Sequence, residues 1–338
     1  MKAAEIVIVG GGVVGASIAY HLTQRGCRDV LVLEREDLLG FGSTGKATGG
    51  VRAQFETEIN IKLSLYSLDF FRDWDFDCGY EPRGYVFLAT DHKHLNFLKR
   101  SSELQRSLGY CEVVLIDPKT IAEMIPGLNC ADIVGGSFGP RDGFIDPLGV
   151  LEGFSSRAIA AGASIETRRE GTAINVKEEK VVGIETNDGM IDAEKVVICA
   201  GAWARSLAKT AGINLPVEPL RRQIVWAKST NPLPADLPMV IDLSDGFHFR
   251  PQKISPTKFF LRIPTKASGR VFQSSSTIRL SKRSMKKHGI ERRSWRKQTL
   301  CGENAGPGFM KTRPIITRSS VAARSKDYIL RTASRAMV

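Results

Sequence analysis

The sequence is poor in cysteine and lacks a long hydrophobic run. Its six cysteines are scattered without a CxxC pair, which argues against a metal site and against a disulfide-rich secreted scaffold. The longest apolar stretch, residues 6–20, is interrupted by four glycines and is too short to cross a bilayer as a helix. The basic segment that opens a signal peptide is missing before it. We therefore expect a cytoplasmic protein with no membrane span.

Acidic residues are scarce in the last quarter of the chain. Residues 253–338 contain 21 lysines and arginines against three acidic residues, whereas residues 1–252 contain 27 against 33. The basic part shows neither a strand period nor a helix period and could not form much of a core. The first part has the composition of a globular protein, and the full length of 338 residues suits two domains.

The first 34 residues have the pattern of a strand, a helix and a second strand. Residues 5–9 are an apolar run, a glycine-rich turn follows, residues 16–25 have helical spacing, and the apolar run at 30–33 ends at Glu34. This order is typical of a Rossmann-like α/β domain with parallel strands. Further along, we expect helices at 57–77, 94–108 and 147–161, and strands at 84–89, 180–185, 196–199, 219–228 and 245–249.

The glycine turn has the spacing of a dinucleotide-binding fingerprint. Gly10, Gly12 and Gly15 follow a predicted strand and open a predicted helix, and Glu34 comes 19 residues after Gly15. Gly10 would make the tight turn, Gly12 would let backbone N–H groups approach a pyrophosphate, and Gly15 would let the helix pack on the strand. Glu34 would accept hydrogen bonds from ribose hydroxyls and repel a 2′-phosphate, which disfavours NADP. The alternative is a plain glycine turn with a solvent-facing Glu34.

A second loop distinguishes a flavin from a nicotinamide. Residues 42–52 read GSTGKATGGVR, which places hydroxyls and small residues where a loop can cross the pyrophosphate. Gly49 and Gly50 would allow backbone contact with an isoalloxazine ring. Together with VIVGGGVVG, LVLE, RDGFIDP, VVICAGAWA, PLRRQIVW and GFHFRP, this loop makes residues 4–251 resemble the D-amino-acid oxidase superfamily of flavoenzymes, particularly glycine oxidase and the sarcosine oxidase β-subunit.

The resemblance implies FAD as the cofactor, held mainly by backbone donors and small side chains. It also implies a second domain whose strands cover the flavin face. The implied FAD contacts are Gly10, Gly12, Val14, Gly15, Glu34, Arg35, Ser43, Thr44, Ala47, Thr48, Gly49, Gly50, Val51, Ala200 and Gly201.

Three residues are candidates for the catalytic site. In sarcosine-type relatives an arginine just beyond the flavin-facing segment pairs with the substrate carboxylate, and Arg52 occupies that place. A bidentate guanidinium suits a carboxylate, although a structural salt bridge is the alternative for Arg52. His248 and Arg250 lie on a strand that faces the substrate in relatives, and alternation would point one or the other toward it. A solvated strand edge is the alternative for both.

These features predict an FAD-dependent oxidoreductase of amines or amino acids. Hydride transfer from the carbon that bears the amine nitrogen to flavin N5 would leave an imine, which water hydrolyses. The partners would be a small amine or amino-acid substrate and an electron acceptor, namely oxygen, a quinone or a partner subunit. We expect no nucleic-acid partner.

The predicted fold is a Rossmann-like FAD-binding domain with an inserted α+β substrate domain. The FAD-binding domain would comprise residues 1–80 and 140–215, and the substrate domain residues 81–139 and 216–257. Residues 258–338 would form a basic and poorly ordered tail.

The tail does not match the closing segment that the resemblance implies, and the genetic code allows its reading frame to be tested. When the third base of each codon is joined to the first two of the next, residues 304–321 permit C-W-A-G-L-Y-E-x-T-P-D-H-H-x-I-I-G, and residues 327–338 permit L-Y-x-A-N-G-F-S-G-H-G. Both strings resemble C-terminal motifs of the family. We therefore interpret the tail as the product of a frameshift near residues 250–258, with the native gene continuing past 338. The printed chain would then lack the segment that closes the flavin pocket and could be inactive.

Two other functions are compatible with the sequence. The basic tail could bind a nucleic acid or an anionic surface, in which case binding would depend steeply on salt. Alternatively, the chain could be a non-catalytic FAD-binding subunit of a larger dehydrogenase, which would bind flavin without turnover.

Overall fold

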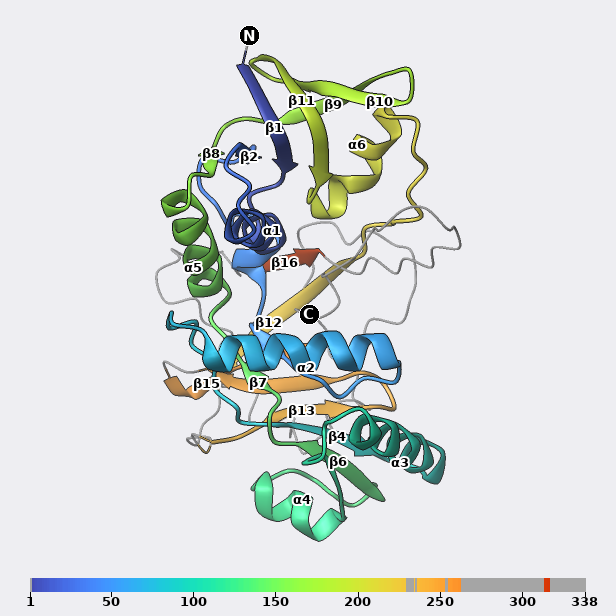
Figure 1. Ribbon diagram of the computed structural model, residues 1–338. Helices are drawn as coiled ribbons and strands as arrows, with labels where there is room; N and C mark the ends of the chain where they lie inside the picture. Colours follow the sequence, from blue (N-terminus) through green and yellow to red (C-terminus); the bar gives the residue numbers. More distant parts are fainter. Residues whose placement is uncertain (1, 229–233, 235, 253–254, 263–312, 317–338) are drawn as a thin grey trace, which may run out of the picture.

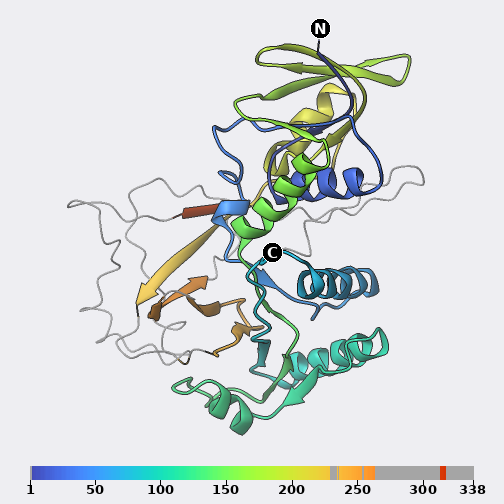
Figure 2. The same ribbon diagram turned by 60° about the vertical axis from the view of Figure 1, so that its left-hand side comes forward.

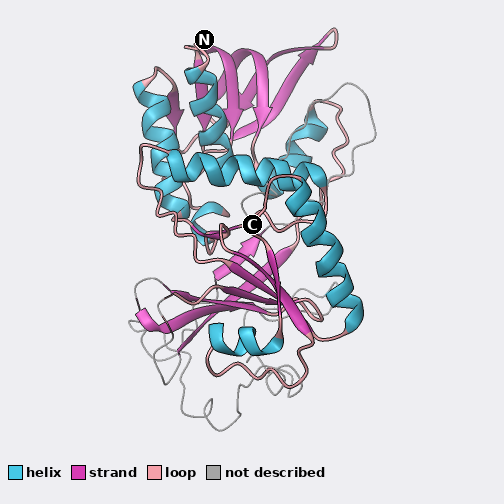
Figure 3. Cartoon of the chain, turned by 60° about the horizontal axis from the view of Figure 1, so that its bottom comes forward, coloured by secondary structure: helices cyan, strands magenta, loops and turns pink. Residues whose placement is uncertain are grey.

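Two β-sheets form two lobes, and helix α2 (Glu58–Asp73) lies between them (Figure 1). Figure 3 shows the same arrangement with the strands in magenta and a layer of helices between the sheets. The computed structural model describes residues 2–228, 234, 236–252, 255–262 and 313–316.

The sheet of the first lobe has the strand order β8-β2-β1-β11-β10-β9. The first four of these strands are parallel, and β10 and β9 continue the sheet in antiparallel pairing. The strands are β1 (Lys2–Val9), β2 (Val30–Leu33), β8 (Ser164–Glu166), β9 (Gly171–Lys177), β10 (Lys180–Thr186) and β11 (Gly189–Ile198). The helices of this lobe are α1 (Val13–Gln24), α5 (Pro147–Ala160) and α6 (Ala204–Thr210), with the short 3₁₀ turns η1 (Thr44–Lys46) and η2 (Gly201–Trp203).

Alternation along β1 explains the layers of the first lobe. Ile6 and Ile8 pack in the cluster that includes α1 and α5, whereas Val7 and Val9 pack in the cluster that includes α6. Because helices cover both faces, the central strands are apolar at successive positions. The result is the three-layer α/β arrangement that the sequence pattern predicted.

The second lobe is a mainly antiparallel sheet with the order β16-β12-β15-β14-β13-β4-β6-β5. The pair β13 and β4 is parallel. The strands are β4 (Tyr85–Ala89), β5 (Val114–Ile116), β6 (Gly135–Gly139), β12 (Arg221–Lys228), β13 (Met239–Asp242), β14 (His248–Gln252), β15 (Ser255–Arg262) and β16 (Arg313–Ile316). Helices α3 (His92–Ser107) and α4 (Pro118–Met124) belong to this lobe, and a two-stranded ribbon, β3 (Gly50–Val51) with β7 (Gly143–Phe144), lies beside it. Figure 2 shows the β12, β14 and β15 end of the sheet in yellow and orange, and β16 in red beside η1 in blue.

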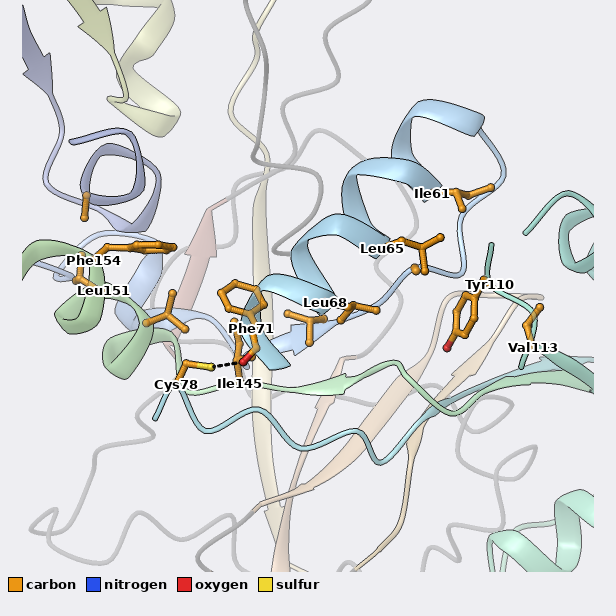
Figure 4. Close-up of a cluster of buried hydrophobic side chains, with 14 residues drawn as sticks. Ile61, Leu65, Leu68, Phe71, Cys78, Tyr110, Val113, Ile145, Leu151 and Phe154 are labelled. Atoms are coloured by element: carbon orange, nitrogen blue, oxygen red, sulfur yellow. Dashed lines mark hydrogen bonds between the residues drawn. The ribbon is translucent and has the colours of Figure 1, made fainter. Parts of the chain in front are cut away.

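A buried cluster around α2 joins the two lobes (Figure 4). Leu65 and Phe71 of α2 pack in the same cluster as Leu151 and Phe154 of α5, and Tyr110 closes the other end. Each fully buried side chain of this size contributes roughly 1.5–3 kcal/mol of transfer free energy. The two lobes therefore share one hydrophobic core through α2.

The helices were predicted with errors of a few residues, and the short strands were missed. The helix expected at 57–77 ends at Asp73, and the helix expected from 94 begins at His92, where Asp91 accepts a hydrogen bond from the His94 N–H at 2.7 Å. Most of the missed elements have seven residues or fewer, and β15 has eight. They are β3, β5, β6, β7, β8, β9, β13, β15, β16, α4 and α6.

Most of the predicted tail lies outside the described residues. Strand β15 crosses the expected boundary at 258 and pairs with β12 and β14. The expectations of poor order, of a frame change and of anionic-surface binding concern residues of which the structure describes only 258–262 and 313–316. Within the described residues, every helix is too short or too polar to span a membrane.

Candidate active site

The turn between β1 and α1 is enclosed by backbone. Gly10 has φ +117°, which favours glycine, and a Cβ there would lie within 3.0 Å of the Cys199 carbonyl. A Cβ on Gly15 would lie within 3.0 Å of the Gly10 carbonyl oxygen. Gly12 is more open, since the nearest atom to its Cβ position is Thr44 Oγ1 at 3.2 Å. Glycine is therefore required at Gly10 and Gly15 by the local packing itself.

Glu34 is fixed at the end of β2 and points at this turn. Its Oε2 accepts a hydrogen bond from the Gly11 N–H at 2.9 Å, and its Oε1 accepts one from the Glu36 N–H at 3.0 Å. The carboxylate therefore does not simply face solvent. It lies beside the fingerprint glycines, where an acidic side chain can accept hydrogen bonds from ribose hydroxyls.

The second loop is tied to the start of α1. Thr44 Oγ1 accepts a hydrogen bond from the Val13 N–H at 3.0 Å. Ser43 precedes η1, and Ala47 follows it in extended conformation. Thr48 leads from there into the ribbon strand β3. The 42–48 loop and the start of α1 thus lie on two sides of the β1 to α1 turn. We call this arrangement the cradle.

Gly49 and Gly50 are close to protein atoms. Gly49 has φ +74°, and a Cβ there would lie within 3.0 Å of the Ile145 carbonyl oxygen. A Cβ on Gly50 would lie within 3.0 Å of the Tyr85 hydroxyl. Contact of these glycines with a flavin ring stays a prediction. The close protein atoms alone already explain why neither position accommodates a side chain.

The residues at this edge fit FAD. Strands β2, β1 and β11 are parallel neighbours, so their carboxyl ends, with Glu34, Gly10 and Ala200, meet at one edge of the sheet. Gly201 follows with φ +53° and no neighbouring atom within 4 Å of its Cβ position. A glycine turn, the start of α1 and a carboxylate at the end of β2 form the donor and acceptor set that a dinucleotide uses.

Trp203 is a residue at this edge that sequence reasoning missed. The Arg35 guanidinium lies 3.8 Å from the centroid of the Trp203 ring, and Arg35 Nε also donates to Glu36 Oε1 at 3.1 Å. The signal was present, because the tryptophan is the last residue but one of the quoted VVICAGAWA string. An aromatic ring two residues beyond Gly201 can reach the side chain that follows Glu34.

The second lobe presents a row of aromatic rings with an arginine at each end. We call Phe87, Tyr85 and Phe144 the aromatic row; the ring of Tyr85 lies 6.4 Å from each of the other two. The Arg52 guanidinium lies 5.3 Å from the ring centroid of Phe87, and the Arg250 guanidinium lies 4.3 Å from that of Phe144. The structure thus brings Arg52, which directly follows β3, and Arg250 of β14 to one site.

His248 and Arg250 share one face of β14, so the expectation that alternation selects only one of them is wrong. Residues two apart on a strand point to the same side. Phe249, between them, packs with Val86 on the opposite face of the sheet, whereas Arg250 contacts Phe144 on the Tyr85 face. His248 lies on the strand beside β13, and its Nδ1 is 3.3 Å from the Gly246 carbonyl oxygen. Both residues are half-buried.

Burial shifts the pKa of two groups at this face. Desolvation lowers the pKa of Arg250 to about 10, partly opposed by the charges of Tyr85 and Glu81. Desolvation raises the pKa of Tyr85, while Arg52 and Arg250 act in the opposite direction. The phenol is therefore protonated and the guanidinium is charged at neutral pH.

A fully buried carboxylate, Asp142, holds the segment that follows Arg52. It accepts hydrogen bonds from the Ala53 N–H at 2.7 Å, from Gln54 Nε2 at 2.9 Å and from the Tyr110 hydroxyl at 3.1 Å. Desolvation raises the pKa of Asp142 to about 6 despite these hydrogen bonds. Asp142 belongs to the quoted RDGFIDP string, but nothing in its spacing indicated that it is buried or what it binds.

The fold and the residues at the carboxyl edge of the first sheet define a Rossmann-type dinucleotide-binding protein. A Rossmann-type sheet supplies a dinucleotide cradle, and the half-buried Arg52 and Arg250 lie against the aromatic row beside the ribbon that leaves the cradle. The chain belongs to the DAO family, described as FAD dependent oxidoreductase, whose model matches residues 5–285. FAD is the cofactor that the description of this family names.

Similar proteins include dehydrogenases and a regulatory subunit. The chain is 31% identical over 259 residues to human "Dimethylglycine dehydrogenase, mitochondrial", and the alignment covers 74% of this chain and 29% of that protein. It is 29% identical over 254 residues to mouse "Pyruvate dehydrogenase phosphatase regulatory subunit, mitochondrial", with 73% and 29% covered. The crystal structure of L-proline dehydrogenase from P. horikoshii superposes with a TM-score of 0.70 at 29% identity and covers 78% of this chain and 72% of that one. The chain thus spans less than a third of the length of these two curated relatives.

Proposed function

We propose that the chain oxidises the carbon–nitrogen bond of a small amino acid or secondary amine. The observation that carries this proposal is the aromatic row with Arg52 and Arg250 at its ends, opposite the Gly49–Gly50 segment of the cradle. Guanidinium groups bind carboxylates with paired hydrogen bonds. Apolar rings around them exclude water and favour a neutral amine over a charged one.

In this proposal the cofactor is held at the carboxyl edge of the first sheet. Backbone N–H groups of the β1 to α1 turn would bind its pyrophosphate, Glu34 its ribose, and the 43–51 loop would run along the rest of the molecule. The chemistry supplied there is acceptance of a hydride at flavin N5 from the carbon that bears the amine nitrogen, which leaves an imine that water hydrolyses. Oxygen, a quinone or a partner subunit would then remove the two electrons.

The protein contributes binding and orientation to this reaction. Arg52 would hold the substrate carboxylate, Arg250 would add a second positive charge, and His248 would lie at the same face of β14. Substrates of this class are supported by the names of two similar enzymes, which give dimethylglycine and L-proline. Both compounds are α-amino acids with an alkylated nitrogen.

The proposal is tested on the purified protein with the reading frame beyond about residue 258 restored. Uptake of FAD is measured by absorbance after gel filtration, and bleaching of the flavin is then followed without oxygen in the presence of dimethylglycine, sarcosine, L-proline or glycine. Bleaching by at least one of them is expected. A chain that takes up no FAD contradicts the proposal outright.

A non-catalytic FAD-binding subunit is the second candidate. The similarity to the pyruvate dehydrogenase phosphatase regulatory subunit favours it. In that case the bound flavin would be reduced by dithionite but by none of the amines.

We also propose that the segment beyond about residue 258 is read out of frame. The genetic-code comparison of residues 304–321 and 327–338 supports this interpretation. Sequencing of the locus tests this interpretation. One unbroken reading frame that encodes the printed tail would refute the frameshift.

A further inference from the structure

Trp203 and Arg35 form a stacked pair at the sheet edge where the cradle lies. Trp203 is the last residue of η2, which follows the carboxyl end of β11, and Arg35 comes two residues after the end of β2. The Arg35 guanidinium lies 3.8 Å from the centroid of the Trp203 ring, so it covers one face of the indole. Because β2 and β11 flank β1 in the sheet, the pair joins the two sides of the glycine turn.

This pair is not part of a hydrophobic core. Trp203 is 43% exposed, and the Arg35 side chain is 34% exposed. By contrast, Trp74 packs against the buried cluster around α2. Glu36 also holds Arg35, because its Oε1 accepts a hydrogen bond from Arg35 Nε at 3.1 Å. A tryptophan and an arginine are thus kept in contact at the surface, beside the cradle.

The place of the pair next to Glu34 indicates which part of a dinucleotide lies beside it. In the proposed binding mode, the Glu34 carboxylate accepts hydrogen bonds from ribose hydroxyls. The base is attached to the ribose carbon beside the one that carries the 2′-hydroxyl, so the base and the residue that binds this hydroxyl are neighbours. The pyrophosphate lies instead at the glycine turn and the start of α1. Adenine is therefore the part of FAD nearest to Arg35.

A guanidinium stacked on an indole is suited to receive a base on its second face. The guanidinium group is planar, and nucleic-acid bases stack both on arginine planes and on aromatic side chains. An arginine side chain alone has many rotamers, and ordering it on binding costs conformational entropy. Contact with Trp203 restricts these rotamers before the ligand arrives.

We propose that Arg35 stacks on the adenine of FAD and that Trp203 is a positioning residue that holds the Arg35 guanidinium parallel to the base. This inference rests on the proposed function, because it takes Glu34 as the residue that binds the ribose. It gives Trp203 a role in cofactor binding and assigns both residues to the adenosine half of FAD and not to the flavin half.

The experiment titrates the FAD-free protein, with its reading frame restored as above, in a calorimeter. The ligands are FAD, ADP as a probe of the adenosine half, and FMN as a probe of the flavin half. Trp203→Leu removes the indole face, and Arg35→Lys keeps the positive charge but removes the plane. Each variant should bind FAD and ADP at least about 5-fold more weakly, which corresponds to about 1 kcal/mol, and should leave FMN binding unchanged.

The double variant tests whether the two residues act through one stack. Arg35→Lys with Trp203→Leu should bind ADP no more weakly than the weaker of the two single variants, because Trp203 acts through Arg35. Additive losses would contradict the stacked arrangement and overturn the inference.

A matched control and a stability measurement exclude a merely structural role. Arg157 also lies over a tryptophan, 5.6 Å from the Trp74 ring centroid, but on α5. Arg157→Lys should therefore bind FAD and ADP as the original protein does. Without ligand, Trp203→Leu should melt at nearly the same temperature as the original protein, because Trp203 is exposed. A marked fall in its melting temperature shows that Trp203 supports the fold and overturns the inference.

The outcomes separate this inference from the proposed function. If the protein takes up FAD but Trp203→Leu binds ADP as tightly as the original does, or if the original binds no ADP, the inference is wrong and the flavin site stands. A loss of FMN binding as large as the loss of FAD binding overturns the inference as well. Failure to take up FAD overturns the proposed function and this inference with it.

Discussion

The Tyr85 hydroxyl occupies the space that a Cβ on Gly50 would need. These two residues belong to different lobes, since β4 is part of the second sheet and Gly50 opens the ribbon that leaves the cradle. The contact therefore limits how closely the 42–52 loop can approach β4.

Gly50→Ala is expected to destabilise the fold by about 1–3 kcal/mol through overpacking. Removal of the hydroxyl should relieve the clash, because the next atoms, Tyr85 Cζ and Met239 Cε, are 3.4 Å from the Cβ position. The double variant Gly50→Ala with Tyr85→Phe should thus recover most of the lost free energy of unfolding. Urea denaturation of the four proteins measures the coupling, and additive effects of the two substitutions contradict the contact.

Gly15→Ala is expected to abolish FAD uptake and to destabilise the first lobe. Its Cβ would meet the backbone carbonyl of Gly10, so α1 would have to move away from the turn that would bind the pyrophosphate. Gly42→Ala is the matched control, because no atom of the described residues lies within 4 Å of its Cβ position and its backbone needs no left-handed conformation. Equal FAD affinity of both variants in a fluorescence titration would refute the role of Gly15.

Arg52→Lys should raise KM for a carboxylate substrate about 10-fold or more, with a smaller change in kcat. Lysine keeps the charge but loses the paired hydrogen bonds of the guanidinium. The control is Arg157→Lys, which replaces a guanidinium that also lies over aromatic rings, 5.6 Å from Trp74 and 5.0 Å from Phe76, but on α5. Steady-state kinetics measure both variants. An unchanged KM in Arg52→Lys would support the alternative of a structural salt bridge.

Asp142 should make stability depend on pH between about 4 and 6. Burial raises its pKa from 3.8 to about 6 in the folded protein. Because the folded pKa lies above the unfolded one, its contribution to stability is fully present below about pH 4 and is lost as the pH rises through 6. A shift of this size corresponds to about 3 kcal/mol. Urea denaturation measures the free energy of unfolding of the original chain and of Asp142→Asn. The difference between the two values should fall by this amount between pH 4 and pH 7. A constant difference would show that Asp142 is ionised throughout this range.

The cradle was predictable because its signals are local. The order of a strand, a glycine turn, a helix, a strand and Glu34 is contained in 34 consecutive residues, and φ +117° at Gly10 is a requirement that only a glycine meets easily. The substrate face was only partly predictable. Arg52 could be named from the motif next to it. Tyr85 lies in an ordinary apolar strand, where the sequence pattern predicts only that a tyrosine is part of the hydrophobic core.

The sequence by itself determined the βαβ unit, the glycine positions of the cradle and the flavin-dependent class, because each depends on residues close together in the chain. Only the tertiary structure decided that Tyr85, Arg52, Phe144 and Arg250 form one site. Three of them come from strands β4, β7 and β14, and Arg52 directly follows β3. The register of β4, β13 and β14 brings Tyr85 and Arg250 to the same part of the sheet. Whether Asp142 is a surface charge or a buried anchor was decided in the same way, since its burial depends on how the lobes pack and not on its neighbours in the chain.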